Sequence, residues 1–288
     1  MSSKSPFFSL VIPTLNEEKL LPLLLEDLAI QTFTDFEVVL VDAQSTDQTQ
    51  AKAKTFQSRL HLTLLTSAQK NVCIQRNSGA DHAQGEYILF MDADTRIPTF
   101  FLEGIHYHII KQPADLFTTW IKVEAENQLD LAIQNMINVG LELYELLGKP
   151  SALGAFIGCH HRVLEKVKFD PDRRYSEDGQ FIQDAYQAGF SFAIFREPCF
   201  YYSLRRLKKE GILKTVGNGA MLQLKYLQGS DFHDETSYVM PGGSYYDHND
   251  VKEVTYLKYI QDSLKKASQK QLTYLKKILL LQSLSDED

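Results

Sequence analysis

The stretch EYILFMDADT, residues 86–95, decides how the rest of the chain is interpreted. Its apolar run from Tyr87 to Met91 ends in two carboxylates, Asp92 and Asp94, with one alanine between them. Two like charges repel each other, and burying either one is costly unless it has a partner. We therefore predict a buried strand with a cation site at its carboxyl end, and we expect the positive charge to come from outside the chain.

Three similar apolar runs precede this stretch, and helical patterns separate all four. Strands that alternate with helices are typical of βαβ units and a mostly parallel sheet. Continuous apolar strands are expected where helices cover both faces of that sheet. The strands are predicted over Phe8–Pro13, Phe36–Asp42, Leu60–Thr66 and Tyr87–Asp92, and the helices over Leu20–Leu28, 45–56 and Asn71–Gln84.

After Pro98 the pattern becomes less regular. We place one α/β domain at residues 1–229, a loop at 230–250 and an amphipathic helical tail at 251–288. The later strands are predicted over Asp115–Ala125, 152–161 and 190–195, and the later helices over Gln128–Leu147 and Ser176–Ala188.

Composition narrows the class of protein. The formal net charge of -7 over 288 residues argues against a general nucleic-acid binder, which would present a basic surface. Three widely spaced cysteines predict neither a disulfide framework nor a zinc site, and they favour a reducing compartment. The apolar runs are too short for a signal peptide or a membrane span. We expect a soluble cytoplasmic protein that is either free or peripheral on the inner face of a membrane.

Polar residues follow three of the predicted strands. In an open parallel sheet, ligands bind at the carboxyl ends of the strands, so residues 13–17, Asp42 and the acid pair should lie along one edge. Asp92 and Asp94 suit Mg²⁺ or Mn²⁺, with phosphate and water as the other ligands. A solvated strand end or a helix cap explains the same pair equally well, and Asp42 alone is best explained as a turn acid.

Three charged groups elsewhere have both a functional and a plain explanation. Arg76 can bind phosphate in a bidentate manner, but a surface arginine fits as well. Glu177 and Asp178 begin a predicted helix, where the helix dipole stabilises acids, although one of them could serve as a general base. Arg205 and Arg206 follow the last strand and suit either phosphate binding or an exposed basic helix face.

Taken in order, four motifs resemble those of the family 2 glycosyltransferases. They are VIPTLNEE (11–18), VVLVDAQSTDQT (38–49), QRNSGADHAQGEYILFMDADT (75–95) and YSEDGQFIQDAYQAG (175–189). The resemblance implies the GT-A fold, a Rossmann-like mixed and mostly parallel sheet flanked by helices. It also implies an inverting, metal-dependent transfer from a nucleotide-diphosphate sugar to the hydroxyl of a glycan or lipid-linked acceptor, in the synthesis of cell-surface glycan or glycolipid.

The resemblance also implies roles for the residues on the donor side. Asp42 would contact the base, and Arg76 would lie by the base or the diphosphate. Asp94 would bind Mn²⁺ or Mg²⁺ on the diphosphate, with Asp92 as a second metal ligand near the ribose or the sugar. The residues implied for the nucleotide pocket are Pro13, Thr14, Asn16 and Glu17.

On the acceptor side, the resemblance makes Asp178 the catalytic base. Glu177, Arg205 and Arg206 would lie on the acceptor or phosphate side. The chain departs from the family at Asp42-Ala43, where many members have two acids, and this puts base recognition in doubt. The QxxRW signature of processive synthases is absent, which favours the addition of a single sugar.

Two alternatives compete with this interpretation. FMDADT also resembles the first motif of haloacid-dehalogenase-type phosphatases, in which Asp92 would be the nucleophile. That motif normally opens its domain, whereas three strands are predicted before it here. The second alternative is a non-catalytic sugar-nucleotide-binding protein, and the intact acids argue against it.

The tail carries an excess of lysines. Residues 251–277 contain seven lysines against Glu253 and Asp262, with apolar residues at helical spacing. Such a helix can lie on an anionic membrane near a lipid-linked acceptor, or it can pack on the domain or on a second subunit of a homo-oligomer. We favour packing on protein.

Overall fold

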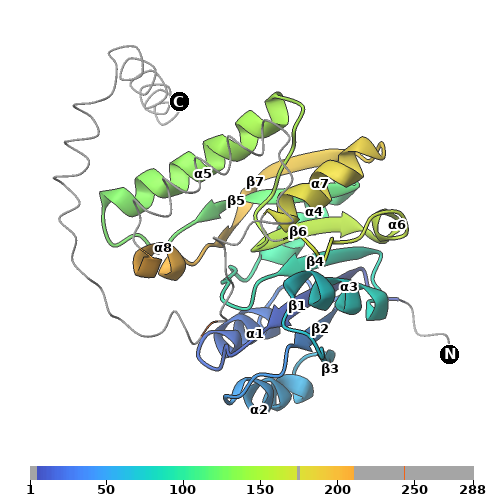
Figure 1. The fold of residues 1–288 in the computed structure, drawn as a ribbon, viewed down its shortest axis with the longest axis vertical. Helices are drawn as coiled ribbons and strands as arrows, with labels where there is room; N and C mark the ends of the chain where they lie inside the picture. The colour runs from blue at the N-terminus through green and yellow to red at the C-terminus, as the bar shows by residue number, and fades with distance from the viewer. Residues whose placement is uncertain (1–4, 174–175, 211–242, 244–288) are drawn as a thin grey trace.

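The computed structural model describes residues 5–173, 176–210 and 243. Seven strands form one sheet in the order β3-β2-β1-β4-β6-β5-β7 (Figure 1). Their bounds are β1 Phe8–Thr14, β2 Phe36–Asp42, β3 Leu62–Thr66, β4 Tyr87–Met91, β5 Leu116–Lys122, β6 Phe156–His160 and β7 Phe192–Tyr201.

Most of the neighbouring strands in the sheet run parallel. β1, β2, β3 and β4 pair in parallel, β6 is antiparallel to both β4 and β5, and β7 returns parallel to β5. The prediction of a mixed, mostly parallel α/β sheet is therefore confirmed. The loops that follow β1, β2 and β4 meet at one edge of the sheet, because parallel strands end on the same side.

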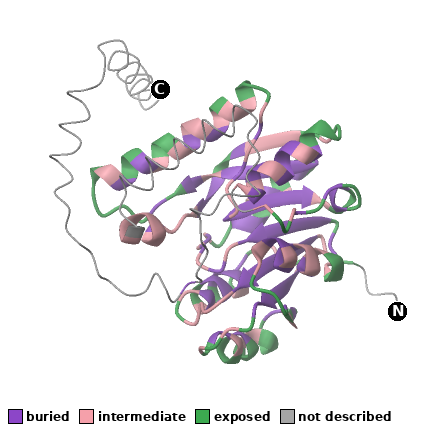
Figure 2. Cartoon of the chain, viewed as in Figure 1, coloured by how far each residue is buried: buried purple, intermediate pink, exposed green. Residues whose placement is uncertain are grey.

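Helices cover both faces of the sheet (Figure 1). Side chains of β1 alternate between two apolar cores: Leu10 and Ile12 face the core with α1 and α4, whereas Val11 faces the core with α3 and α7. β1 is therefore buried on both sides (Figure 2). The helix bounds are α1 Leu21–Ala29, α2 Thr49–Lys54, η1 Thr55–Ser58, α3 Val72–His82, α4 Phe101–Lys111, α5 Gln128–Leu146, α6 His161–Leu164, α7 Glu177–Gln187 and α8 Arg205–Glu210.

The structure contains one long helix that the sequence patterns did not predict, and several elements end at other residues than predicted. α4 packs Phe101, Leu102, Ile105 and Ile109 into the core, and this helical spacing was present in the sequence. β7 extends six residues beyond the predicted end at 195, and the strand predicted to end at Asp92 ends at Met91. Such shifts of element ends are common, because local propensity is weakest there.

Part of the predicted layout lies outside the described residues. The end of the predicted domain at 229, the loop at 230–250 apart from Gly243, and the tail at 251–288 cannot be compared with the structure. The division into domain, loop and tail stays a prediction. Within the described ranges, every helix is too short or too polar to cross a membrane.

Candidate active site

A network of hydrogen bonds connects the loop that follows β1 with the loop that follows β2. Asp42, at the end of β2, is fully buried, and its carboxylate accepts hydrogen bonds from Ser45, Gln50 and Thr14. Asn16 adopts a left-handed backbone (φ 54°), and its side-chain oxygen accepts the backbone N–H of Thr46 at 2.8 Å. In this structure Asp42 therefore holds the loops in place, and its contact with a base stays a prediction.

A buried glutamine on α3 fixes the same strand ends. The Nε2 of Gln75 donates to the carbonyl oxygens of Thr14 (3.0 Å) and Val41 (2.7 Å), at the point where Pro13 of β1 stands opposite Val41 of β2. The backbone N–H of Glu17 donates to the Thr49 hydroxyl at 2.8 Å. The residues predicted to line the nucleotide pocket thus lie together at an edge of the sheet that these hydrogen bonds hold in place. Gln75 was not among the residues predicted from the sequence.

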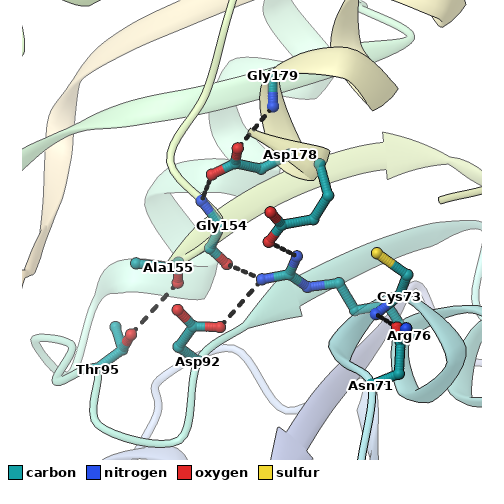
Figure 3. Close-up of polar contacts among 10 residues, drawn as sticks. Asn71, Cys73, Arg76, Asp92, Thr95, Gly154, Ala155, Asp178 and Gly179 are labelled. Atoms are coloured by element: carbon teal, nitrogen blue, oxygen red, sulfur yellow. Dashed lines mark hydrogen bonds and ion pairs between the residues drawn. The ribbon is translucent and has the colours of Figure 1, made fainter. Parts of the chain in front are cut away.

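Arg76, also on α3, joins distant parts of the chain (Figure 3). Its Nη2 donates to Asp92 (3.1 Å) and to the carbonyl of Gly154 (3.1 Å), and its Nη1 donates to Glu177 (3.3 Å). The guanidinium lies 5.2 Å from the centre of the Phe169 ring, a cation–π distance. The side chain is only 2% exposed, so Arg76 links the acids after β4 with those that begin α7.

The charges around Arg76 explain why a buried arginine is tolerated. Burial alone would lower the pKa of Arg76, but Asp92 and Glu177 outweigh it and raise the pKa. The guanidinium also packs against Gly154, where an added Cβ would lie 2.5 Å from Nη2 of Arg76 and would force one of the two to shift.

Asp178 lies next to this cluster at the start of α7. One of its carboxylate oxygens accepts the backbone N–H of Gly154 at 2.6 Å, and the other accepts that of Gly179 at 2.7 Å. Burial and the neighbouring charge of Glu177 raise the pKa of Asp178 to about 7, although Arg76 opposes this shift. A carboxyl group with such a pKa can take up a proton near neutral pH.

The backbone before Asp178 is strained. Ser176 has a left-handed conformation (φ 55°), which non-glycine residues rarely adopt. The turn directs Glu177 inward onto Arg76, whereas Asp178 is only half-buried. Strain of this kind is frequent where a side chain must be held for function.

Arg205 makes a second link between acids. Its Nη2 donates to Glu17 at 2.6 Å and its Nε donates to Asp94 at 3.1 Å. Gly243 lies at the same place: its N–H donates to the carbonyl of Leu15 at 3.0 Å, and any Cβ there would overlap the Glu17 carboxylate. The loop after β1, the acid pair and the C-terminal half of the chain therefore converge here.

The expectation that positive charge must come from outside the chain is wrong for this structure. Asp92 is paired with Arg76, and Asp94 is paired with Arg205. The residues still suit a divalent cation, because Asp94 already binds a cationic group and both acids offer the hard oxygen ligands that Mg²⁺ and Mn²⁺ prefer. Three or more His, Cys, Asp or Glu side chains do not cluster as a ready metal site within the described ranges.

Tyr202 belongs to the site but was missed. Burial and the charges of Asp94 and Asp92 raise its pKa, whereas Arg206 lowers it, so the phenol and Arg206 lie near the acid pair. A tyrosine directly after an apolar strand gave no signal in the sequence. The cysteines are not candidates for catalysis, since all three are buried and burial raises the pKa of Cys73 to about 12.

A family model agrees with this geometry. The model for glycosyl transferase family 2 matches residues 9–199, a range that contains β1 through most of β7. Among curated proteins, the poly(ribitol-phosphate) beta-N-acetylglucosaminyltransferase TarS of Staphylococcus aureus is 26% identical over 234 residues, which cover 79% of this chain and 39% of TarS. A PGL/p-HBAD biosynthesis glycosyltransferase of Mycobacterium bovis is 42% identical over 92 residues, 31% of this chain and 36% of that protein. The chain spans well under half of either relative.

Solved structures share the fold. TarS residues 1–349 in complex with UDP-GlcNAc superpose with a TM-score of 0.57 at 24% identity, covering 68% of this chain and 58% of that chain. The mannosyltransferase PcManGT from Pyrobaculum calidifontis, in complex with GDP-Man and Mn²⁺, gives a TM-score of 0.57 at 19% identity, covering 70% of this chain and 58% of that chain. At these identities the likeness establishes the fold alone.

Proposed function

The chain belongs to glycosyl transferase family 2, and we propose that it moves one sugar from a nucleotide-diphosphate sugar to an acceptor hydroxyl with inversion at the anomeric carbon. The observation that carries this proposal is the position of Asp178. It is a half-buried carboxyl with a pKa of about 7, held by two backbone N–H groups beside the cluster of Arg76, Asp92 and Glu177.

In the proposed step, Asp178 takes the proton from the acceptor hydroxyl. The acceptor oxygen forms a bond to the anomeric carbon, and the bond from that carbon to the diphosphate oxygen breaks on the opposite face. The transition state resembles an oxocarbenium ion, as in glycoside hydrolysis. Gly154 and Gly179 hold the carboxylate through their N–H groups, so its orientation is set before the acceptor arrives.

The donor is assigned to the edge at the ends of β1, β2 and β4. Pro13, Thr14 and Asn16 would line the nucleotide pocket beside Glu17, with Asp42 behind them. Asp94 and Asp92 would hold Mn²⁺ or Mg²⁺, which when bound would offset negative charge on the departing diphosphate. Arg205 and Arg206, on α8, would turn to the diphosphate or to the acceptor when a cation takes Asp94.

The relatives support a class of substrate. TarS is bound to UDP-GlcNAc and PcManGT to GDP-Man and Mn²⁺ in their structures, so nucleotide sugars are the donors to test first. The names of TarS and the mycobacterial relative refer to poly(ribitol-phosphate) and to PGL/p-HBAD biosynthesis. We therefore propose a glycan or lipid-linked acceptor in the synthesis of the cell envelope.

The test of the mechanism is Asp178→Asn. Loss of a general base is expected to lower transfer by about 10²- to 10⁴-fold, while binding of the nucleotide diphosphate changes little. The matched control is Asp184→Asn on the same helix, whose side chain contacts Gln180 instead of the cluster. If Asp178→Asn turned over at the wild-type rate, the assigned base would be wrong.

A thermal-shift screen identifies the donor. Nucleoside diphosphates and sugar nucleotides are tested with Mn²⁺ and with Mg²⁺, and a ligand at about 100 times its Kd should add about 2.7 kcal/mol of stability. The best binder is then assayed for release of nucleoside diphosphate. Binding without turnover over a broad panel of acceptors would favour a sugar-nucleotide-binding protein, and phosphate release from a phosphomonoester would favour a phosphatase that uses Asp92.

A further inference from the structure

The long helix α5 presents polar side chains to the domain. Asn138 accepts the backbone N–H of Ile121 at 2.9 Å and donates to the carbonyl of the same residue at 3.0 Å, so it takes the place of a strand partner for β5. Gln134 accepts the N–H of Val123 at 2.9 Å. Part of the face that a globular helix normally fills with apolar residues is therefore used for hydrogen bonds to the backbone of β5.

The outer face of α5 is apolar instead. Met136, Leu143 and Leu146 are 53%, 47% and 83% exposed, and exposed positions recur along the helix in Figure 2. Ala132 and Val139 complete a row whose spacing of four, three, four and three residues is that of a helix-pairing seam. We call this row the α5 stripe; its residues are Ala132, Met136, Val139, Leu143 and Leu146.

The charge around the α5 stripe restricts its partner. Residues 123–148 contain five acids and neither lysine nor arginine. Three of the acids pair with cations of other elements: Glu126 and Asp130 with Lys208, and Glu142 with Arg196. Two of the five acids, Glu142 and Glu145, lie on α5 beside the stripe. The remaining acids, Glu124 and Glu145, leave the surface without the basic residues that attract anionic lipid. A basic amphipathic helix suits both the apolar row and its acidic flanks.

The sequence contains such a segment. Residues 251–277 carry seven lysines and two acids, a net charge of +5, against -5 for residues 123–148. Leu257, Ile260, Leu264 and Ala267 follow one another at spacings of three, four and three. This is the same seam pattern as on α5, so two helices can interlock along it.

The described residues bring the chain close enough for this contact. Gly243 is buried against the loop after β1, where Glu17 contacts Arg205 of α8. Lys208, one turn further along α8, pairs with Glu126 and Asp130 at the start of α5. The eight residues from 243 to 251 can span up to about 26 Å, nearly the length of α5, which is about 28 Å.

We infer that the α5 stripe is the docking surface for residues 251–277 of the same chain, which pack on it as a helix. The inference is independent of the proposed function, since it rests on the outer face of α5 and leaves the acid cluster aside. The docked segment would cover the apolar row and place its lysines beside Glu142 and Glu145.

Disulfide trapping in the full-length protein tests this contact. Leu143→Cys is combined in turn with cysteine at 257, 260, 264 or 267, and with Asp262→Cys as the matched control, because residue 262 faces the opposite side of a helix. Bridged Cα atoms must come within about 7 Å. We expect at least one seam pair to give an intrachain disulfide in about tenfold higher yield than the Asp262 pair. The native cysteines are buried, and the single variants control for them.

Each other outcome overturns the inference. Disulfide-linked dimers from the seam pairs would assign the stripe to a second copy of the chain. Equal yields for seam and control pairs would mean that the segment does not dock there. Vesicles of phosphatidylcholine and phosphatidylglycerol provide the remaining test: if Leu143→Glu abolished sedimentation with them, whereas Ile110→Glu on the exposed face of α4 did not, the partner would be a membrane.

Discussion

Arg76 and Arg205 do similar work in different surroundings. Each binds two acids from different parts of the chain: Arg76 holds Asp92 and Glu177, and Arg205 holds Glu17 and Asp94. The side chain of Arg76 is 2% exposed and that of Arg205 is 18% exposed. The Arg76 guanidinium is closed off from solvent, so nothing outside the chain can take its place beside Glu177. The Arg205 guanidinium is more accessible, so water or a metal ion can replace it beside Asp94. The difference lies in the two arginines, because the Asp92 side chain is 38% exposed and that of Asp94 is 24% exposed.

Because of this difference, we propose that Asp92 and Asp94, the two acids after β4, have different roles. Asp92 pairs with the buried Arg76, which also holds Glu177 beside Asp178, so we propose that Asp92 helps to keep the site assembled in addition to facing a bound cation. Asp94 pairs with the more accessible Arg205, and we propose that it exchanges this arginine for a divalent cation. A pattern of two acids separated by one residue can thus combine a structural position with a binding position.

The largest loss of stability is expected for Arg76→Ala. The change leaves Asp92 and Glu177 without their cation, and removing one partner of a buried ion pair typically costs about 3–5 kcal/mol. Chemical denaturation should show a loss of this size. The control is Arg59→Ala, because Arg59 makes an exposed bidentate pair with Glu26 that water and salt screen, so its loss should change stability far less. Equal losses of stability for Arg76→Ala and Arg59→Ala would show that the buried arginine contributes no more than an exposed one.

Gly154→Ala tests the same cluster without removing a charge. The new Cβ would lie 2.5 Å from Nη2 of Arg76 and 3.3 Å from the Asp178 carboxylate, so one of the two must shift. Overpacking of this kind costs about 1–3 kcal/mol, and the moved carboxylate should lower kcat more than KM. Gly140→Ala on α5 is the matched control, because nothing lies within 4 Å of its added Cβ. A fully active, fully stable Gly154→Ala protein would contradict the packing described for Arg76.

Local patterns predicted most of the sheet. Apolar runs identified the strands, and β2 was predicted with its observed bounds because both faces of the sheet bury it. Motifs identified the acids of the candidate site. The partners of those acids could not be predicted from local patterns, because they are distant in the sequence. Arg76 and Glu177 are 101 residues apart, and Arg205 and Glu17 are 188 residues apart. Only the fold brings these residues together, and for the same reason the burial of Arg76 was not foreseen.

Arg205→Ala tests whether Arg205 competes with a divalent cation for Asp94. Loss of the competing cation should cost about 1 kcal/mol of stability or less and should tighten Mn²⁺ binding in the absence of nucleotide by about three- to tenfold. Electron paramagnetic resonance titration of free Mn²⁺ measures this directly, with Arg59→Ala as the control. Unchanged or weaker Mn²⁺ binding without nucleotide would show that Arg205 does not compete for Asp94.

The last prediction concerns the pH dependence of stability at Asp178, which lies beside the buried cluster of Arg76 and Glu177. Its pKa is about 7 in the folded protein, well above that of an ordinary aspartate, so the folded state binds the proton more tightly than the unfolded state. Stability should therefore fall as the pH rises from about 4 to about 7, because ionisation is less favourable in the folded chain. Asp178→Asn removes this dependence, and its Tm relative to wild type should rise by a few degrees between about pH 4 and about pH 8. Asp184→Asn, on the same helix, is the control because its side chain contacts Gln180 instead of the cluster. If Asp178→Asn and the wild-type protein showed the same pH dependence of Tm, the Asp178 carboxyl would titrate like a solvated aspartate, and activity would not require the pH to exceed about 7.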